Sequence, residues 1–336
     1  MTIVLVLVTL LLALPWAGAA VARRLAVVLP PRWACWSLTG AALLLAGGTV
    51  SALVGLFHVP LLAVLERLPL SRVRAEWPAA VPIACAAGAA MLVQLVMLVR
   101  RWLGHRSLLR RAWLATGGST VDGDLLVVPG ADVDAFALPA YRGRPGRVVV
   151  TSGMVRALKP GEREVLLAHE RAHLAGRHHL LSAVVDLAAV VHPAVGGLRG
   201  ALGFHLERWA DEDAAAVVGD RRTAAAAIAR AALKGSSRSR PDGYPLLSAT
   251  SGPVPQRVQA LLLPKPVAPR GGVRRAGALA MGTLVASVAI GSLALAYGLH
   301  EYVEYASSHL LGTPSGCSGL WGALEDLLGS GTGRGF

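Results

Sequence analysis

Four long uncharged apolar runs constrain the fold of this chain more than any other feature. They cover residues 2–22, about 33–58, about 79–99 and about 276–298. A helix needs roughly 20 apolar residues to cross the hydrocarbon core of a bilayer, so each run is long enough to span a membrane. The composition agrees, because 54% of the residues are hydrophobic and only 16% are charged, whereas soluble domains carry about 25% charged residues. We therefore expect a polytopic membrane protein.

The first run could instead be a secretory signal peptide, because it ends in the small residues of WAGAAVA. However, no positively charged segment precedes it, and its apolar stretch is longer than a signal peptide needs. We expect this run to be retained as a membrane span.

Arginine clusters beside the runs predict the orientation of the chain, because cytoplasmic loops are enriched in Lys and Arg. With four spans, three clusters can lie in the cytoplasm together. The N-terminus is then outside, residues 100–275 are cytoplasmic and the C-terminal tail is outside. The 58–78 loop fits least well, since it places three arginines outside. The three clusters are Arg23, Arg24 and Arg32; Arg100, Arg101, Arg106, Arg110 and Arg111; and Arg270, Arg274 and Arg275.

The net charge of +13 therefore indicates contact with a lipid bilayer. Direct nucleic-acid binding is not expected, because the chain shows no aromatic–basic patch, zinc-finger spacing or RNA-binding signature. Its 3 cysteines lie in apolar runs and in the tail, so they indicate neither a disulfide framework nor a cysteine metal site.

The polar middle of the chain, residues 100–275, has an α+β pattern. Short strand-like runs at 124–130, 134–139 and 147–153 are bounded by Gly, Pro and Asp. A helix is expected to begin near Pro160, which suits a first helical turn. Two more helices are expected at 201–218 and 221–234.

The helix after Pro160 contains the pattern HExxH at residues 169–173. His169 and His173 lie one turn apart on the same helical face, so both can offer imidazole nitrogens to one Zn²⁺. Glu170 lies beside them and can act as general base toward water. The alternative is a pair of solvated histidines. The apolar neighbours in EVLLAHERAHLAG would instead bury the pair, so we favour a metal site.

The third ligand is open at this point, because the longer pattern HExxHxxGxxH would make His179 that ligand. Enzymes with this pattern need a Met-containing turn downstream, and the only downstream methionine, Met281, lies in the fourth apolar run. The helical pattern also continues past Gly176. A continuous helix would place His179 about 15 Å along the axis from His169. We therefore disfavour His179.

The stretch LERWADEDAA, residues 206–215, offers a different third ligand. Glu207 and Asp211 lie four residues apart and share a helical face. A carboxylate ligand can be accompanied by a second carboxylate that orients a ligand histidine through its other ring nitrogen. The alternative is a solvated acidic face, which we expect for Glu212 and Asp213.

The apolar stretch 180–198 lies between His173 and Glu207. A single crossing of the bilayer there would separate the two side chains. Two crossings need roughly 40 residues, and fewer residues than that are available. We expect this stretch to be re-entrant or to lie at the membrane interface.

HExxH followed by ExxAD resembles the gluzincin membrane proteases, which include the CAAX prenyl proteases, the HtpX-type proteases and the BlaR/MecR-type sensor-transducers. The resemblance covers residues 125–234, and the short interval between the second His and the Glu is similar to the BlaR/MecR-like branch. Those sensors carry a large external penicillin-binding domain. Only about 38 residues follow the last apolar run here, so we expect no direct β-lactam sensing.

The resemblance implies one Zn²⁺ per chain, with His169, His173 and Glu207 as ligands, Glu170 as the base and Asp211 supporting a ligand histidine.

It also implies that an edge strand pairs with an extended peptide substrate. The family usually has Asn-Ala-Phe in this strand, where this chain has Asp134-Ala135-Phe136. Ala135 and Phe136 are the expected substrate-binding residues.

These observations predict a mostly helical α+β membrane protein with four transmembrane helices and a cytoplasmic gluzincin-type zinc peptidase domain. The predicted parts are a three-span N-terminal domain (1–100), the peptidase domain (101–268), and a final span with a short external tail (269–336). The expected function is a zinc endopeptidase at the cytoplasmic face that cleaves a transcriptional repressor or turns over membrane proteins. The alternative is a non-catalytic membrane sensor or scaffold with a vestigial zinc site.

Overall fold

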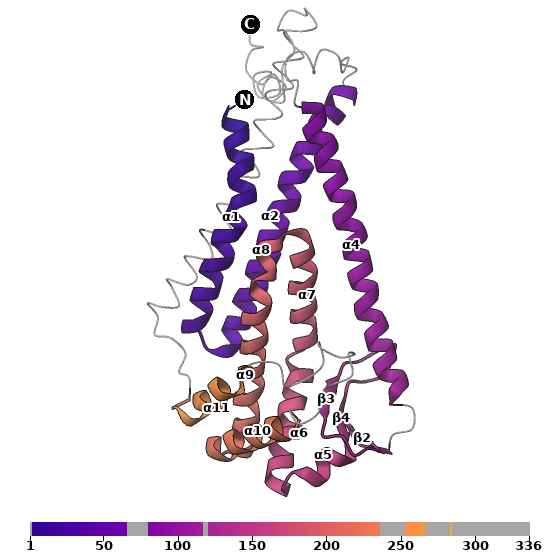
Figure 1. Cartoon of the computed structure of the whole chain (residues 1–336), viewed down its shortest axis with the longest axis vertical. Coiled ribbons are helices and arrows are strands. Elements are labelled where there is room, and N and C mark those ends of the chain that lie inside the picture. Colours follow the sequence, from indigo (N-terminus) through magenta and orange to yellow (C-terminus); the bar gives the residue numbers. More distant parts are fainter. Residues whose placement is uncertain (1, 66–79, 117–119, 236–252, 266–282, 284–336) are drawn as a thin grey trace, which may run out of the picture. The chain divides into compact units, whose positions relative to one another are not determined.

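The computed structural model describes residues 2–65, 80–116, 120–235, 253–265 and 283 (Figure 1). Its internal contacts divide the chain into two units, one of residues 1–52 with 90–292 and one of residues 53–89 with 293–336. All the side chains discussed below as a candidate site lie in the first unit. The domain boundaries expected near residues 100 and 268 stay predictions.

The first three apolar runs form long helices, namely α1 (Thr2–Val28), α2 (Pro31–Leu65) and α4 (Ala80–Ala115). Among the described residues, Pro31–Phe57 and Val81–Ala115 are helical, long and apolar enough to cross a membrane. The chain is thus a candidate membrane protein. The fourth run lies outside the described residues, so the count of four spans stays a prediction. α4 also continues past the third run and contains the cluster Arg100–Arg111, since arginine is a good helix former.

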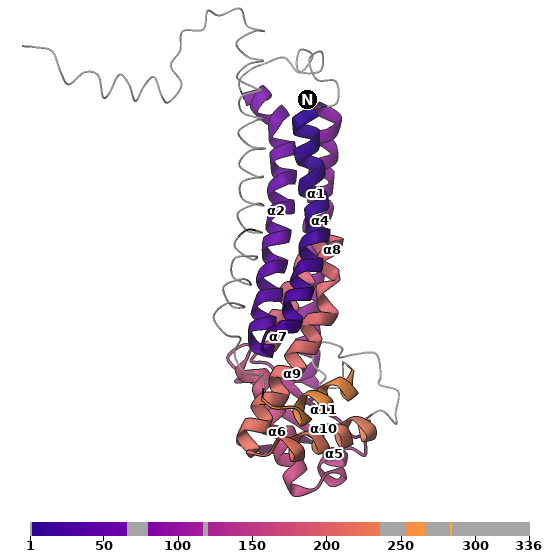
Figure 2. The ribbon, with the colours of Figure 1, turned by 90° about the vertical axis from the view of Figure 1, so that its left-hand side faces the viewer.

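The stretch 180–198 folds back on itself as a helical hairpin. α7 (His178–Val191) runs into the short α8 (Pro193–Gly196), and α9 (Leu198–Val218) returns beside α7 (Figure 1). The apolar side of this hairpin packs against α1 and the first part of α2 in a buried cluster that includes Ala22, Leu38, Val185, Val195 and Leu202. Figure 2 shows α1 and α2 running side by side. The ends of the hairpin therefore lie together, as a shared metal site requires.

A buried carboxylate ties this hairpin to α4. Asp186 of α7 is almost fully buried and accepts a hydrogen bond from Arg101 Nε at 2.8 Å. His105 Nε2 of α4 lies 3.1 Å from the same carboxylate, and Arg199 Nε of α9 lies 2.6 Å from it. A buried charge is tolerated only when it is paired and hydrogen-bonded. These contacts therefore join α4, α7 and α9 at Asp186 and fix their positions along one another.

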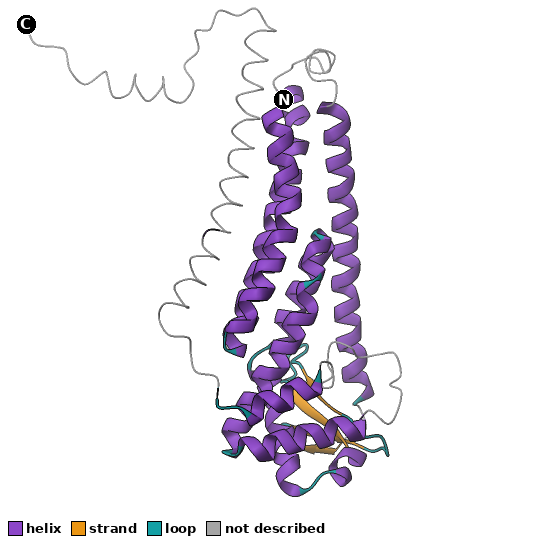
Figure 3. Cartoon of the chain, turned by 60° about the vertical axis from the view of Figure 1, so that its left-hand side comes forward, coloured by secondary structure: helices purple, strands orange, loops and turns teal. Residues whose placement is uncertain are grey.

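The three expected strands are present as β2 (Leu125–Val128), β3 (Ala135–Leu138) and β4 (Arg147–Thr151). Sequence analysis missed the short β1 (Thr120–Asp122), which completes a sheet of order β1-β2-β4-β3. β3 lies at the end of this order, and among the described strands its one partner is β4, with which it pairs antiparallel. The strands (orange in Figure 3) lie below the end of α4, where Ala112 and Trp113 pack on the sheet.

The helix expected near Pro160 is α6 (Pro160–Ala175), and the next two expected helices are α9 and α10 (Arg221–Gly235). α5 (Ser152–Ala157) and α11 (Val254–Leu262) were not expected. The Lys159 backbone N–H donates to Glu162 at 3.0 Å, which caps the first turn of α6.

The expectation that α6 continues past Gly176 is wrong. Arg177 adopts a left-handed conformation with φ of 49°, and α7 departs from α6 at 53°. The imidazole of His178 folds back over Gly176, where a Cβ would collide with its ring. Only glycine allows this close approach. The apolar pattern alone could not show it, because both helices carry similar apolar residues.

We predict that Gly153→Ala destabilises the protein by about 1–3 kcal/mol, because the new Cβ would collide with the carbonyl oxygens of Asp132 and Ala131. Unfolding of the purified protein in detergent measures the change. Gly161→Ala is the matched control, because its Cβ would meet open space, and it should be neutral or stabilising by about 0.4–1 kcal/mol. Equal stability of both variants would contradict this packing.

Candidate active site

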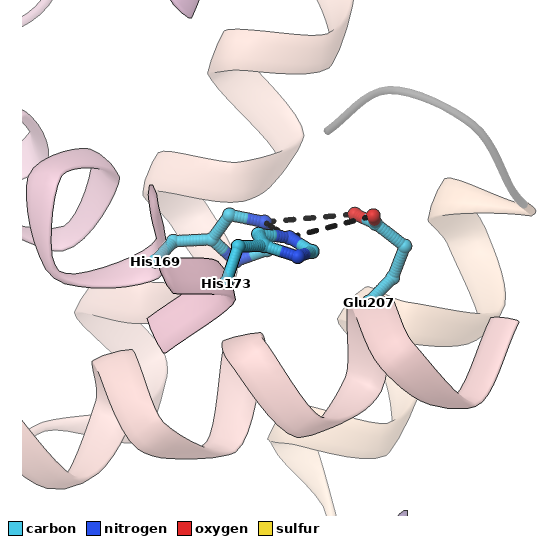
Figure 4. Close-up of side chains that lie close together, drawn as sticks. All are labelled: His169, His173 and Glu207. Atoms are coloured by element: carbon cyan, nitrogen blue, oxygen red, sulfur yellow. Dashed lines mark hydrogen bonds and ion pairs between the residues drawn. The ribbon is translucent and has the colours of Figure 1, made fainter. Parts of the chain in front are cut away.

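The two histidines of the HExxH pattern converge on one point beside α6. His169 is buried and His173 is partly buried, and their Nε2 atoms lie 3.1 Å apart (Figure 4). This follows from helical geometry, since residues four positions apart lie one turn apart on the same face. The two rings are edge to face, with centroids 4.8 Å apart.

Glu207 reaches the same point from α9. Its Oε2 lies 3.5 Å from His169 Nε2, and its Oε1 lies 3.5 Å from His173 Nε2. Two atoms that are each about 2.0–2.1 Å from a tetrahedral Zn²⁺ lie about 3.3 Å apart. The spacing of these three side chains therefore fits a shared zinc. Within the part of the chain that the structure describes, His169, His173 and Glu207 form the one cluster of potential ligand side chains that could hold a metal ion.

Asp211 lies one turn after Glu207 on α9, and its Oδ1 is 3.0 Å from His169 Nδ1. Burial disfavours the charge on His169, but Asp211 and Glu207 outweigh it and raise the pKa of the ring to about 10. A metal ion would replace that proton, because histidine coordinates as the neutral ring. The carboxylate of Asp211 then holds the other ring nitrogen, which fixes the orientation of His169.

His178, at the start of α7, is a buried partner of His173. The two Nδ1 atoms lie 2.8 Å apart, and the His178 ring packs on Trp209 with centroids 4.6 Å apart. Burial and the neighbouring His169 hold the pKa of His173 well below its usual range. His173 is thus neutral, and its Nδ1–H can donate to His178 while Nε2 faces the candidate metal position.

Arg257 is the functional candidate that sequence analysis missed altogether. It projects from α11, is 3% exposed, and places Nη1 2.9 Å from Glu207 Oε2. Its Nη2 and Nε lie 2.7 Å and 2.8 Å from the Asp211 carboxylate. The only signal in the sequence is a single cation on the apolar side of VPQRVQALL, and no local pattern links it to α9, 46 residues away.

The charges of the site also fit a divalent cation. Three carboxylates are buried here, those of Glu170, Glu207 and Asp211, and Arg257 is the guanidinium that faces them. Buried charge requires compensation. Arg257 balances one of the two carboxylates that it contacts, and a Zn²⁺ held by the neutral histidines would balance the other, together with Glu170 when Glu170 is ionised.

Glu170 is 1% exposed and borders a cleft beside β3. Burial raises the pKa of Glu170 to about 7, against the opposing effect of His169. A group with a pKa near neutrality can both take up and release a proton at physiological pH. The cleft is largely apolar and lies between β3, α6, α10 and α11, and its lining includes Asp134, Ala135, Met154, Leu166, Ile228 and Ala231.

Other sequence candidates lie elsewhere. His179 belongs to α7 and is not part of the group around the candidate metal position. Arg221 of α10 binds Glu212 and the carbonyl oxygens of Leu261 and Ala260. Glu212 is therefore ion-paired and not a solvated acid.

Phe136 packs toward Ala112 and Trp113 of α4, away from the cleft that Ala135 lines.

Comparison with known families finds a match between residues 124–241 and the model of peptidase family M48. No curated protein and no solved structure matches the chain. The matched segment begins just before β2, includes α6 and α9 with their His169, His173 and Glu207, and ends after α10. Zinc is typical of this family. The match does not confirm the closer assignment to the BlaR/MecR-like branch.

We predict that purified wild-type protein and the His179→Ala variant each bind about one zinc per chain, and that Glu207→Ala loses it. Elemental analysis of the protein after dialysis gives the metal content directly. Removing one of three protein ligands weakens a tetrahedral site, whereas His179 lies outside the group. Zinc retained by Glu207→Ala and lost by His179→Ala would exclude the proposed ligand set.

Proposed function

We propose that this chain, whose residues 124–241 match peptidase family M48, is a membrane-bound zinc endopeptidase. The observation that carries the proposal is the convergence of His169, His173 and Glu207, whose ligand atoms lie 3.1 to 3.5 Å apart, beside the buried Glu170. His169, His173 and Glu207 would hold one Zn²⁺. Asp211 and His178 would fix the orientations of the two imidazoles.

When bound, the zinc supplies Lewis-acid chemistry, polarising a water and the carbonyl of the peptide bond. Glu170 takes a proton from that water and passes it to the leaving amine. Its place next to His169 on α6, in the lining of the same cleft, suits this role. Burial of its carboxylate also excludes bulk water from the proton it carries.

The substrate would bind as an extended peptide along the edge of β3 that faces away from β4. The carbonyl oxygen of Asp134 accepts the N–H of Thr151 at 3.0 Å, so residues 134, 136 and 138 form the hydrogen-bonded pairs with β4. The backbone groups of Ala135 and Ala137 then face outward, and those of Phe136 face β4. We therefore propose Ala135 and Ala137, in place of Ala135 and Phe136, as the substrate-pairing residues.

The side chain of Asp134 occupies part of this edge. Its Oδ1 accepts the Ala135 N–H at 3.0 Å, which closes off one outward-facing donor. Burial raises the pKa of Glu170, and a hydrogen bond between the Ala137 backbone and the Glu170 carboxylate partly opposes this rise. The substrate would therefore pair mainly with the carbonyl groups of the strand, next to the proposed base.

The arginine pattern supports a cytoplasmic position for the site, and the hairpin contacts support a re-entrant stretch at 180–198. Gln94 Nε2 of α4 donates to the carbonyl oxygen of Val191 at 3.0 Å, near the tip of the hairpin. Gln94 precedes Arg101 by about two helical turns, which is about 10 Å along α4. The tip would therefore lie deeper in the bilayer than the arginine cluster. Irregular backbone at that depth is tolerated where protein covers it.

The substrate class would be a cytoplasmic repressor or a membrane protein cut near the inner face. The resemblance to BlaR/MecR-type proteins supports the repressor, and the long apolar helices α2 and α4 of the same chain support the membrane protein. If Glu170→Gln left the turnover of every candidate repressor unchanged in cells, the repressor would be excluded.

We predict that the purified protein cleaves a generic unfolded substrate, that a chelator abolishes the activity and that zinc restores it. Glu170→Gln should lower kcat at least 10²-fold, since it removes the general base, while zinc content stays at the wild-type level. Glu164→Gln is the matched control, because Glu164 lies on the same helix and is exposed. Zinc binding without cleavage by the wild type would favour a non-catalytic sensor.

We also predict the orientation of the site by cysteine labelling in intact cells, in a background without the native Cys35, Cys85 and Cys317. A membrane-impermeant maleimide should label Arg72→Cys directly and Arg222→Cys only after permeabilisation. The reason is that the arginine pattern places residues 100–275 inside. The reverse labelling pattern would invert the proposed topology.

A further inference from the structure

Arg257 contacts two of the side chains on which the proposed metal centre depends, although it lies outside the segment that matches peptidase family M48. It comes from α11, and no motif in the sequence connects it with His169 or Glu207. A buried arginine is rare unless it is fully paired. Arg257 is almost completely buried, so its partners define what it does.

The guanidinium spans two carboxylates of α9. Nε and Nη2 form a two-pronged contact with Asp211 at 2.8 and 2.7 Å. Nη1 reaches Glu207 Oε2 at 2.9 Å, while Glu207 Oε1 faces His173 Nε2 at 3.5 Å. A planar guanidinium bound in this way restricts the rotation of both carboxylates.

The contact with Asp211 extends to His169. Asp211 Oδ1 lies 2.7 Å from Arg257 Nη2 and also 3.0 Å from His169 Nδ1. The same guanidinium therefore acts on Glu207 directly and on His169 through Asp211. Two of the three proposed ligands depend on one side chain for their orientation.

We propose that Arg257 is a positioning residue that sets the zinc affinity of the site by holding Glu207 and Asp211 in their ligand geometry. The proposal rests on the function proposed above, because it assumes that His169, His173 and Glu207 bind the metal. The role requires the planar fork of arginine. A lysine would keep the positive charge but could not hold two carboxylates in fixed planes.

A purely structural role of Arg257 in docking α11 can be separated from this one. The other end of α11 is held by Arg221 of α10, which donates to the carbonyl oxygens of Leu261 and Ala260 at 3.1 and 3.0 Å. Arg221 also pairs with Glu212, which is not a proposed ligand. Arg221→Lys therefore loosens α11 without touching the metal centre.

The test compares Arg257→Lys and Arg221→Lys with the wild type in the full-length protein in detergent. Zinc affinity is measured by competition with a chromophoric chelator, and the stability of the zinc-free protein by thermal unfolding. Loss of a side chain that orients metal ligands typically weakens metal affinity 10- to 100-fold. We expect a loss of this size in Arg257→Lys, near wild-type affinity in Arg221→Lys and similar losses of stability in both. If Arg257→Lys does not fold, Arg257→Gln, which keeps N–H donors, takes its place.

Wild-type zinc affinity in the Arg257 variants would overturn the proposal. An equal loss of affinity in Arg221→Lys would also overturn it, since docking of α11 alone would then explain the effect. Both results leave the proposed peptidase function standing. A wild type that binds no zinc would remove the proposed function itself, so the two failures are distinguishable.

Discussion

The candidate metal centre requires two helices with an apolar stretch between them to meet on the same side of the membrane. α6 supplies two imidazoles and α9 supplies a carboxylate, and the hairpin of α7, α8 and α9 joins them. Because the hairpin turns back at His192–Gly197, the ligands lie 3.1 to 3.5 Å apart. The backbone at the turn is satisfied locally, since His192 Nδ1 accepts the Ala194 N–H at 3.2 Å and Gln94 donates to Val191.

Ion pairs at two separate places hold the hairpin of α7, α8 and α9 in position. Near the sheet, Arg257 compensates the carboxylates of Glu207 and Asp211. Further along the hairpin, Asp186 is compensated by cations from α4 and α9. Each buried carboxylate would cost several kcal/mol if it were left unpaired, so the hairpin cannot shift along α4 or α11 without breaking pairs. Ion pairs to α11 and to α4 therefore both hold the helices that carry the candidate metal ligands.

The residues that sequence analysis found share one property, which is that their partners lie close by along a helix. His169 and His173, or Glu207 and Asp211, are one turn apart, so spacing alone shows that they share a face. Local signals also predicted the three longer strands, which are bounded by Gly, Pro and Asp, and the start of α6 at Pro160. The contacts of Arg257 with Asp211 and of Asp186 with Arg101 could not be predicted, because these pairs are 46 and 85 residues apart. The contact of His178 with His173 could not be predicted either, because it depends on the break after Gly176, which the apolar pattern hides.

The outer edge of β3, which pairs with no further strand among the described residues, links this architecture to the proposed chemistry. An exposed edge strand invites pairing with other chains, and proteins usually block or shorten such edges. Here β3 has only four residues, and Asp134 closes one of its outward-facing donors. Ala137 meets Glu170, so within the described residues the outward-facing carbonyl groups of Ala135 and Ala137 are left for pairing, beside an apolar cleft formed with α10 and α11. An extended peptide that pairs there would bring its backbone within reach of the base and the candidate metal together, which neither the sheet nor the α6–α9 pair could achieve alone.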